Sequence, residues 1–312
     1  MARTVLLGDP SFFRVKSGSN PHTRDGLGRR KRVDLSSAIA QWGDLKSALE
    51  QNGLRVRVIP PDPELPGLVF PANAGFRFGS RFYLSNLNPA RAAEKQHYRR
   101  AVSALGLAVQ DLPGDTPFEG EADFIPVGHP SGDPARAVYL FTTGRIEQPR
   151  WVFRAGFPPY RRVYGFRSDC RALPALRSIV QPLEVMLLEL VDERHYHGDT
   201  VLCTFGPRNE YLMASLDGLA PESARSLQAR FGDRLLPLES QDGRCFAANS
   251  FQVMAERYGE QVPVLLMPDG LSLEVYEQVR ARGVIPFPLD VSEFLQKGGG
   301  AVKCMLLDLG DL

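Results

Sequence analysis

The chain has 312 residues, which is long enough for one large core or for two ordinary domains. Its 37 lysines and arginines nearly balance 36 aspartates and glutamates, so the formal net charge is +1. This balance excludes an overall field that would draw the protein to nucleic acid or to anionic lipid, and we expect neither partner. A small-molecule role is therefore the default.

No stretch of the sequence reaches the roughly 18 uninterrupted apolar residues of a membrane span, and the N-terminus lacks a signal-type apolar region. We therefore expect a cytoplasmic protein. The four cysteines fit neither a paired zinc spacing nor a disulfide-dense framework, so each is treated as a single thiol, and no metal or cofactor is expected. They are Cys170, Cys203, Cys245 and Cys304.

The first predicted helix spans residues 34–52, where Asp34 or Ser36 can cap its start and Gly53 can end it. An apolar stripe at helical spacing supports this prediction. The stripe consists of Ile39, Trp42, Leu45 and Leu49. The following residues 54–59, LRVRVI, alternate apolar and basic side chains as a half-buried strand does.

The same helix-then-strand unit recurs along the rest of the chain. Three further copies end their helix at a glycine, and one copy is hinged at a proline. These positions are Gly106, Pro182, Gly232 and Gly283. The spacing is about 50–60 residues except for one long gap, which contains residues 144–165. This segment is rich in aromatic residues, arginine and proline, and we interpret it as an insertion.

Five α/β units with extra strands between them, such as residues 200–205 and 211–216, predict a closed fivefold ring with one strand of each unit pointing at a shared centre. We expect residues 1–312 to form this single domain. The alternative is a doubly wound parallel sheet, which also alternates helices and strands. Against it, the sequence after the first strand, GDPSFFRVKSGSN, contains neither a GxGxxG pattern nor a P-loop.

One cysteine near the C-terminus follows an unusual run of glycines. Residues 298–300 are three consecutive glycines, and Cys304 comes four residues later, before an apolar strand. Glycines let the backbone approach a ligand closely and expose amide donors, which a purely structural strand entry does not need. A lone cysteine is ordinarily buried and inert, so both this interpretation and a nucleophile stay open.

Two histidines, His195 and His197, follow the most apolar predicted strand, and Asp199 lies two residues beyond the second. In an extended segment, positions two apart point to the same side. His197 and Asp199 can therefore face one cavity as a general base and an orienting carboxylate. A surface ion pair is the alternative explanation.

A third candidate is an acidic segment, FEGEADFI. Glu119, Glu121 and Asp123 alternate between Phe118 and Phe124, so we expect three carboxylates on one side of an extended segment. Such carboxylates repel one another unless they meet a cation or solvent. The segment is therefore either a solvated edge strand or an acidic grip on a planar cation.

Several short segments, taken in their order along the chain, resemble those of a known enzyme family. They are VFPANAGF (69–76), NPARAAEKQHY (88–98), FEGEADFI (118–125), GFRSD (165–169), HYHGDT (195–200) and GGGAVKC (298–304). From Asn20 to Cys304 the chain resembles the amidinotransferase superfamily. These guanidine-modifying enzymes include arginine deiminases, dimethylarginine dimethylaminohydrolases, arginine dihydrolases and glycine amidinotransferases. The resemblance implies the pentein fold, a five-bladed α/β propeller.

The resemblance also implies a mechanism, in which the Cys304 thiolate attacks the central carbon of a guanidine or amidine. His197 protonates the leaving nitrogen and then deprotonates the incoming nucleophile, and Glu119 is the acidic member of the triad. The resemblance further implies substrate-binding residues. These are Asp199 and Asp123 for guanidinium nitrogens, Arg91 and Arg167 for a substrate carboxylate, and Asn73 and Asn20 near the site.

The expected activity is hydrolysis of a C–N bond in a guanidino compound of arginine metabolism, with no cofactor. An amidinotransferase that passes the same intermediate to an amine is the second hypothesis, because the resolving nucleophile leaves no required side chain in the sequence. A non-catalytic binding protein with a degraded site is the third. The sequence leaves homo-oligomerisation open.

One position departs from the family pattern. Where many relatives have PDxVF, this chain has Gly67, so the aspartate that commonly grips the guanidinium is absent. Either Asp62 or Glu64 reaches in from the neighbouring loop, or the substrate lacks the group that the aspartate would bind. We expect unmodified arginine to be a poor substrate and Gly67→Asp to improve its binding, because unpaired guanidinium donors cost about 1–3 kcal/mol.

Overall fold

The computed structural model describes residues 3–16, 20–156 and 159–312. In these ranges the strands form five three-stranded sheets and one two-stranded sheet. Each three-stranded sheet has the same plan: the central strand pairs antiparallel with one neighbour and parallel with the other. None of the described sheets is the long parallel sheet of a doubly wound fold, so that alternative is wrong.

The strands are β1 (Arg3–Gly8), β2 (Arg55–Ile59), β3 (Gly75–Phe78), β4 (Arg81–Leu84), β5 (Ala108–Asp111), β6 (Phe124–Val127), β7 (Val138–Thr143), β8 (Arg150–Phe153), β9 (Tyr160–Val163), β10 (Glu184–Glu189), β11 (Leu202–Phe205), β12 (Tyr211–Ala214), β13 (Leu235–Pro237), β14 (Phe251–Arg257), β15 (Glu260–Pro268), β16 (Ile285–Leu289) and β17 (Leu306–Asp311). The α-helices are α1 (Leu35–Gln51), α2 (Lys95–Ser103), α3 (Leu173–Val180), α4 (Pro221–Phe231), α5 (Ser240–Arg244), α6 (Leu273–Ala281) and α7 (Ser292–Gly298). Short 3₁₀ turns connect several of them.

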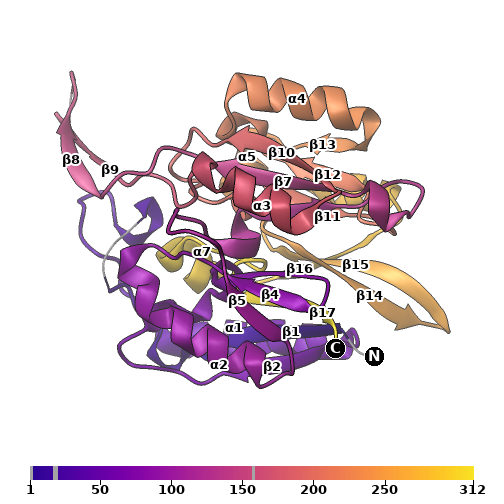
Figure 1. Cartoon of the computed structure of the whole chain (residues 1–312). Coiled ribbons are helices and arrows are strands. Elements are labelled where there is room, and N and C mark those ends of the chain that lie inside the picture. Colours follow the sequence, from indigo (N-terminus) through magenta and orange to yellow (C-terminus); the bar gives the residue numbers. More distant parts are fainter. Residues whose placement is uncertain (1–2, 17–19, 157–158) are drawn as a thin grey trace.

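The first sheet joins the two ends of the chain, because β1 pairs antiparallel with β17 and parallel with β2. The N- and C-terminal strands therefore lie side by side (Figure 1). The other sheets follow in chain order, as β3–β4–β5, β6–β7–β10, β11–β12–β13 and β14–β15–β16. In each sheet one helix lies in the crossover between the parallel strands; these helices are α1, α2, α3, α4 and α6. The predicted helix-then-strand units are confirmed.

Apolar cores join these sheets in cyclic order. One core lies between each pair of consecutive sheets, and a fifth lies between the last sheet and the first. Residues that share a core across these junctions are Leu6 and Phe82, Phe76 and Phe141, Leu140 and Leu212, Met213 and Leu265, and Val5 and Leu266. Each sheet buries both faces, which explains why the strands carry so many apolar residues.

Helix α1 begins where the sequence predicts it, because the Asp34 side chain accepts hydrogen bonds from the backbone N–H groups of Ser36 and Ser37. Its buried face differs from the predicted stripe. Ile39 is 46% exposed, while Leu45 and Leu49 are fully buried. The buried positions are Ala38, Gln41, Leu45, Ala48 and Leu49, which follow the same helical spacing from a starting point one residue earlier.

The segment 144–165 contains the hairpin β8–β9, which lies outside the five three-stranded sheets. The hairpin projects from the body of the protein (Figure 1), and Trp151 and Tyr160 on it are each 57% exposed. Residues 157 and 158 of this segment lie outside the described ranges. Within those ranges, none of the helices is long and apolar enough to cross a membrane.

Candidate active site

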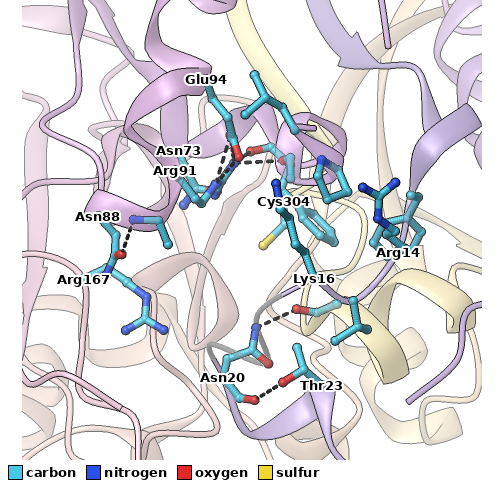
Figure 2. A pocket seen from close by; sticks show the side chains of 18 of the residues that line it. Arg14, Lys16, Asn20, Thr23, Asn73, Asn88, Arg91, Glu94, Arg167 and Cys304 are labelled. Carbon is cyan, nitrogen blue, oxygen red and sulfur yellow. Dashed lines mark hydrogen bonds and ion pairs between the residues drawn. The ribbon is translucent and has the colours of Figure 1, made fainter. Parts of the chain in front are cut away.

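A cavity with a volume of about 330 Å³ brings together loops from distant parts of the chain. Most of the residues predicted for the site line it; they are Cys304, His197, Glu119, Asn73, Arg91, Arg167 and Asn20. Asp123 and Asp199 are buried beside this cavity but do not line it. Figure 2 shows Arg91 and Asn73 together on one wall, with the Cys304 sulfur at the centre and Arg14 on the opposite side.

The glycines before Cys304 are required by close packing. Gly299 ends α7 in the left-handed conformation, with φ of 81°. A Cβ atom added to Gly298 would lie 2.5 Å from the Phe70 ring, and one added to Gly300 would lie 2.7 Å from the Cβ of Cys304. The run therefore lets the chain turn tightly and brings Cys304 to the cavity wall.

Cys304 itself is 3% exposed. Its thiol donates a hydrogen bond to Asp199 Oδ2 at 3.2 Å, and its sulfur accepts one from Asn249 Nδ2 at 3.1 Å. Burial raises the pKa of the Cys304 thiol well above its ordinary value, and the neighbouring Asp199 carboxylate raises it further. Without a ligand, Cys304 is therefore protonated at neutral pH.

His197 and Glu119 form a buried ion pair, with 2.8 Å between His197 Nε2 and Glu119 Oε2. Burial opposes both charges, but the hydrogen bond to His197 and its charge hold the pKa of Glu119 at about 2. The pKa of His197 is raised, because the charges of Asp123 and Glu119 outweigh its burial. Glu119 also accepts hydrogen bonds from Asn73 Nδ2 and from the backbone N–H of Asn88. The cavity therefore contains a proton donor fixed in orientation.

The acidic segment 118–125 does not place its three carboxylates on one side, so that prediction is wrong. A 3₁₀ turn over Gly120–Ala122, with φ of 59° at Gly120, breaks the extended alternation. Glu119 faces the cavity, whereas Glu121 forms an ion pair with Lys303 at 2.8 Å. Asp123 points elsewhere.

Asp123 supports the loop that carries His197. Its oxygens accept hydrogen bonds from the hydroxyls of Thr142 and Ser168 at 2.7 and 2.6 Å, and from the backbone N–H of Gly198 at 2.9 Å. Burial raises the pKa of Asp123 to about 6. These bonds fix the backbone next to His197.

A second cavity of about 150 Å³ is lined by Lys303, the neighbour of Cys304, and by residues from β1, β3, β6, β7, β11, β14 and β17. Asp199 lines this second cavity while its Oδ2 contacts the Cys304 thiol. The 3₁₀ turn Gly198–Thr200 breaks the alternation between His197 and Asp199, so these two side chains do not line the same cavity. Among the described residues, Asp199 Oδ1 has no hydrogen-bond partner.

Arg91 is held in a network on the cavity wall. Its Nη1 donates to Asn73 Oδ1 at 2.6 Å, and its Nη2 donates to the carbonyl oxygens of Gly67 and Phe70 and to Glu94 Oε2. Glu94 and Arg91 form an ion pair of 2.7 Å, and Figure 2 shows the two side chains next to each other. Arg91 thus fixes the orientation of Asn73, which contacts the His197–Glu119 pair.

Glu94 fills the space that a side chain at position 67 would need. A Cβ atom built on Gly67 would overlap Glu94 Oε1 and would lie 3.3 Å from Arg91 Nε. Asp62 does not line the cavity, and Glu64 lines it but pairs with Lys16 at the exposed mouth. Neither of the proposed substitutes therefore takes this place. Because Glu94 is buried there, we no longer expect Gly67→Asp to improve binding.

Arg167 and Asn20 complete the walls. Arg167 Nη1 donates to the Gly165 carbonyl oxygen at 3.0 Å, and its guanidinium lies 5.1 Å from the centre of the Tyr196 ring. Asn20 Nδ2 donates to the Gly298 carbonyl oxygen at 2.8 Å and to the Tyr196 hydroxyl at 3.1 Å. Asn20 thereby connects the N-terminal loop to the glycine run before Cys304.

Sequence reasoning missed Glu94, Tyr196, Lys16 and Asn249 as members or neighbours of the site. Glu94 had a detectable signal, because it stands three residues after Arg91 and helical spacing brings such residues together. Asn249 had none, since its contacts join segments separated by about fifty residues in the sequence.

Comparison with known proteins identifies the family. No family model matches the chain. N(G),N(G)-dimethylarginine dimethylaminohydrolase of Mycobacterium tuberculosis is 30% identical over 309 residues, which cover 98% of this chain and 86% of that protein. The chain belongs to the amidinotransferase superfamily, whose members have the pentein fold.

A cyanobacterial member of this superfamily is similar over part of its own length. The bifunctional arginine dihydrolase/ornithine cyclodeaminase AgrE of Nostoc is 27% identical over 304 residues, which cover 97% of this chain but only 37% of AgrE. The crystal structure of AgrE with L-arginine superposes with a TM-score of 0.79 at 25% identity, covering 98% of this chain and 40% of that chain. The chain thus spans well under half of AgrE.

The solved N-terminal domain of ArgZ, a cyanobacterial arginine dihydrolase, covers nearly the same length as this chain. In its product complex it superposes with a TM-score of 0.80 at 24% identity, covering 99% of this chain and 98% of that domain. A dimethylarginine dimethylaminohydrolase adduct gives a TM-score of 0.69 at 16% identity. These two comparisons establish the common fold.

Proposed function

We propose that the protein hydrolyses a C–N bond of a guanidino or amidino compound through a covalent intermediate on Cys304. The observation that carries this proposal is that Cys304 shares one cavity with the His197–Glu119 ion pair, which provides a nucleophile and an oriented proton donor in a single site. The relatives, which are named as arginine dihydrolases and as a dimethylarginine hydrolase, support the same chemistry.

The first half-reaction forms the intermediate. A bound guanidinium beside Cys304 lowers the pKa of the thiol, whose proton is already directed at Asp199 Oδ2. The thiol proton passes to Asp199, and the sulfur attacks the central carbon and forms a C–S bond. His197, held as a cation by Glu119, gives its proton to the departing nitrogen as the C–N bond breaks. An amine or ammonia leaves, and the thiouronium-like group remains on Cys304.

The second half-reaction restores the enzyme. His197 is now neutral and takes a proton from a water molecule, whose oxygen attacks the same carbon. The C–S bond breaks, the electron pair returns to the sulfur of Cys304, and the sulfur takes its proton back from Asp199. If the attacking group is an amine instead of water, the same steps transfer the amidino group, so the amidinotransferase hypothesis needs no further residue.

We propose a free amino-acid derivative as substrate, with its carboxylate received near Arg167. Arg91 lines the same cavity, but its guanidinium is bonded to Glu94, Asn73 and backbone carbonyls, so we assign it the positioning of Asn73. Asp199 does not line this cavity, but it contacts the Cys304 thiol, and we propose that its carboxylate accepts a guanidinium N–H beside the sulfur once substrate is bound. Asp123 has three donors already, and we assign it an indirect role through the His197 loop. Asn73 and Asn20 orient the two walls.

We also propose that the sheets are the blades of one five-bladed α/β propeller, a single domain over residues 1–312 with 144–165 as an insertion. The cyclic order of the apolar cores supports it. So do the neighbouring antiparallel strands, since β17 lies beside β3, β6 beside β11, and β11 beside β14.

The deciding experiment is a mass-spectrometric screen of guanidino compounds, run with and without an added amine. A hydrolase releases an amine and a urea-type product in both conditions, whereas an amidinotransferase forms a new guanidine only when the amine is added. Binding without turnover of any compound indicates the non-catalytic protein and refutes the proposal. Cys304→Ser is the control that links turnover to the thiol.

A further inference from the structure

Asn249 makes hydrogen bonds with both loops that form the catalytic centre. It lies between α5 and β14, directly before Ser250, and its side chain is fully buried. Its Oδ1 accepts hydrogen bonds from the backbone N–H groups of Ala301 at 2.8 Å and of Cys304 at 3.2 Å. Its Nδ2 donates to the Asp199 carbonyl oxygen at 2.9 Å and to the Cys304 sulfur at 3.1 Å.

These contacts fix which end of the amide faces the sulfur. Two backbone N–H groups can only be satisfied by the carbonyl end of Asn249, and the Asp199 carbonyl oxygen can only be satisfied by the NH₂ end. Rotating the amide by half a turn would leave three buried backbone groups unpaired. The group next to the Cys304 sulfur is therefore an N–H donor.

The donor and the acceptor around the sulfur have opposite effects. Asp199 Oδ2 accepts a hydrogen bond from the neutral thiol and repels a thiolate, while the N–H of Asn249 is a better partner for an anionic sulfur than for a neutral one. The positive charge of Lys303 also favours the thiolate, and Lys303 lines the second cavity, where it pairs with Glu121. The anionic sulfur formed during the reaction thus has a hydrogen-bond donor in place before substrate arrives.

We propose that Asn249 is a further catalytic residue of this site: its Nδ2–H stabilises the Cys304 thiolate while its Oδ1 holds the backbone of the nucleophile loop. The expected effect of Asn249 on turnover rests on the proposed function. Its expected effect on the reactivity of the Cys304 thiol does not, because the contact between Asn249 and the sulfur exists without substrate.

The test measures the rate at which iodoacetamide alkylates Cys304 as a function of pH. The product is followed by mass spectrometry of the peptide that contains Cys304, so that alkylation of the other cysteines does not contribute to the signal. Asn249→Asp keeps an oxygen for the Ala301 and Cys304 N–H groups but replaces the donor opposite the sulfur by an oxygen. We expect alkylation at neutral pH to slow about tenfold and its midpoint to move up by about one pH unit. Asn249→Ser, which removes the amide without adding charge, should shift the midpoint in the same direction by less.

The matched control is Asn52→Asp at the end of α1, where another buried amide donates to a backbone carbonyl, that of Ala48. This variant should leave the alkylation midpoint of Cys304 unchanged. If the midpoint in the Asn249 variants equals that of the unaltered protein, the proposal is overturned, even when the melting temperature falls. If Asn249→Asp does not fold, Asn249→Ser decides by the same measurement.

Turnover adds a second readout. With a guanidino substrate, the Asn249 variants should lower kcat more than they change KM, because the donor acts on the reacting sulfur. Equal loss in both constants together with an unshifted midpoint would indicate a structural role only. If the unaltered protein turns over no guanidino compound, the proposed function fails, and the alkylation profile still decides the role of Asn249.

Discussion

Replacing Gly67 by aspartate restores the residue that many relatives carry, yet the structure predicts that it harms this protein. A Cβ atom at position 67 would overlap Glu94 Oε1 and approach Arg91 Nε to 3.3 Å. The Glu94 side chain is only 3% exposed and is held by Arg91 and by the Tyr98 hydroxyl. The new side chain must therefore displace a buried ion pair.

The size of the effect follows from two contributions. Adding a methyl group in a packed site costs about 1–3 kcal/mol, so we expect Gly67→Ala to lower the free energy of unfolding by about 2 kcal/mol. Aspartate adds a second carboxylate beside Glu94, and the guanidinium that would pair with it is already bonded to Glu94, Asn73 and backbone carbonyls. With that uncompensated charge, we expect Gly67→Asp to cost about 4 kcal/mol.

The assay is urea denaturation at neutral pH of four proteins, namely the parent, Gly67→Asp, Glu94→Ala and the double variant. In the double variant the aspartate can replace Glu94 as the partner of Arg91. Its loss of unfolding free energy should therefore be smaller than the sum of the two single losses by at least about 2 kcal/mol. Arginine binding should be weaker in Gly67→Asp than in the parent. A single Gly67→Asp variant that is as stable as the parent and binds arginine more tightly would refute this account of position 67.

Three further outcomes test the site. Cys304→Ser should retain substrate binding by calorimetry but lose nearly all turnover, because serine forms almost no anion at neutral pH; undiminished activity would show that no cysteine adduct is needed. In the folded protein the pKa of Glu119 is about 2, against an ordinary 4.5. The ionised Glu119 therefore contributes about 3 kcal/mol to the free energy of unfolding above pH 4.5, and this contribution is lost as the pH falls toward 2. Glu119→Gln should therefore lose less unfolding free energy over this range in urea titrations than the parent does, and an equal loss in both proteins would contradict the ion pair with His197. Arg91→Lys should lower stability by about 2–3 kcal/mol and reduce turnover, because lysine lacks the planar fork that reaches Glu94 and Asn73 together; parent-like denaturation curves would argue against this.

Local signals in the sequence were sufficient to predict the helix and the strand of each individual α/β unit. Asp34 caps α1 through its own neighbours, and the glycines at 53, 106 and 283 adopt the left-handed conformation that ends a helix. Their regular spacing indicated five related units, because each unit encodes its own helix, turn and strand within about 50 residues. The order of short motifs likewise indicated the family, and with it the proposed nucleophile.

Details that depend on single turns were not predictable in this way. The 3₁₀ turns at Gly120–Ala122 and Gly198–Thr200 separate Glu121 from Glu119 and Asp199 from His197, although alternation in the sequence placed each pair on one side. Such turns depend on close contacts with distant backbone: a Cβ atom on Gly120 would lie 2.5 Å from the carbonyl oxygen of Gly75.

The sequence by itself therefore determined the repeating α/β unit, since each unit depends on neighbours within a few turns of chain, and it indicated the residues that we propose as reactive. Only the tertiary structure decided which carboxylates face the cavity, that Glu94 occupies the space at Gly67, and that Asn249 directs its N–H at Cys304. The physical reason is that hydrogen bonding and packing in the buried site join loops from all parts of the chain, and their partners are chosen by distance in space, which the order of residues does not record.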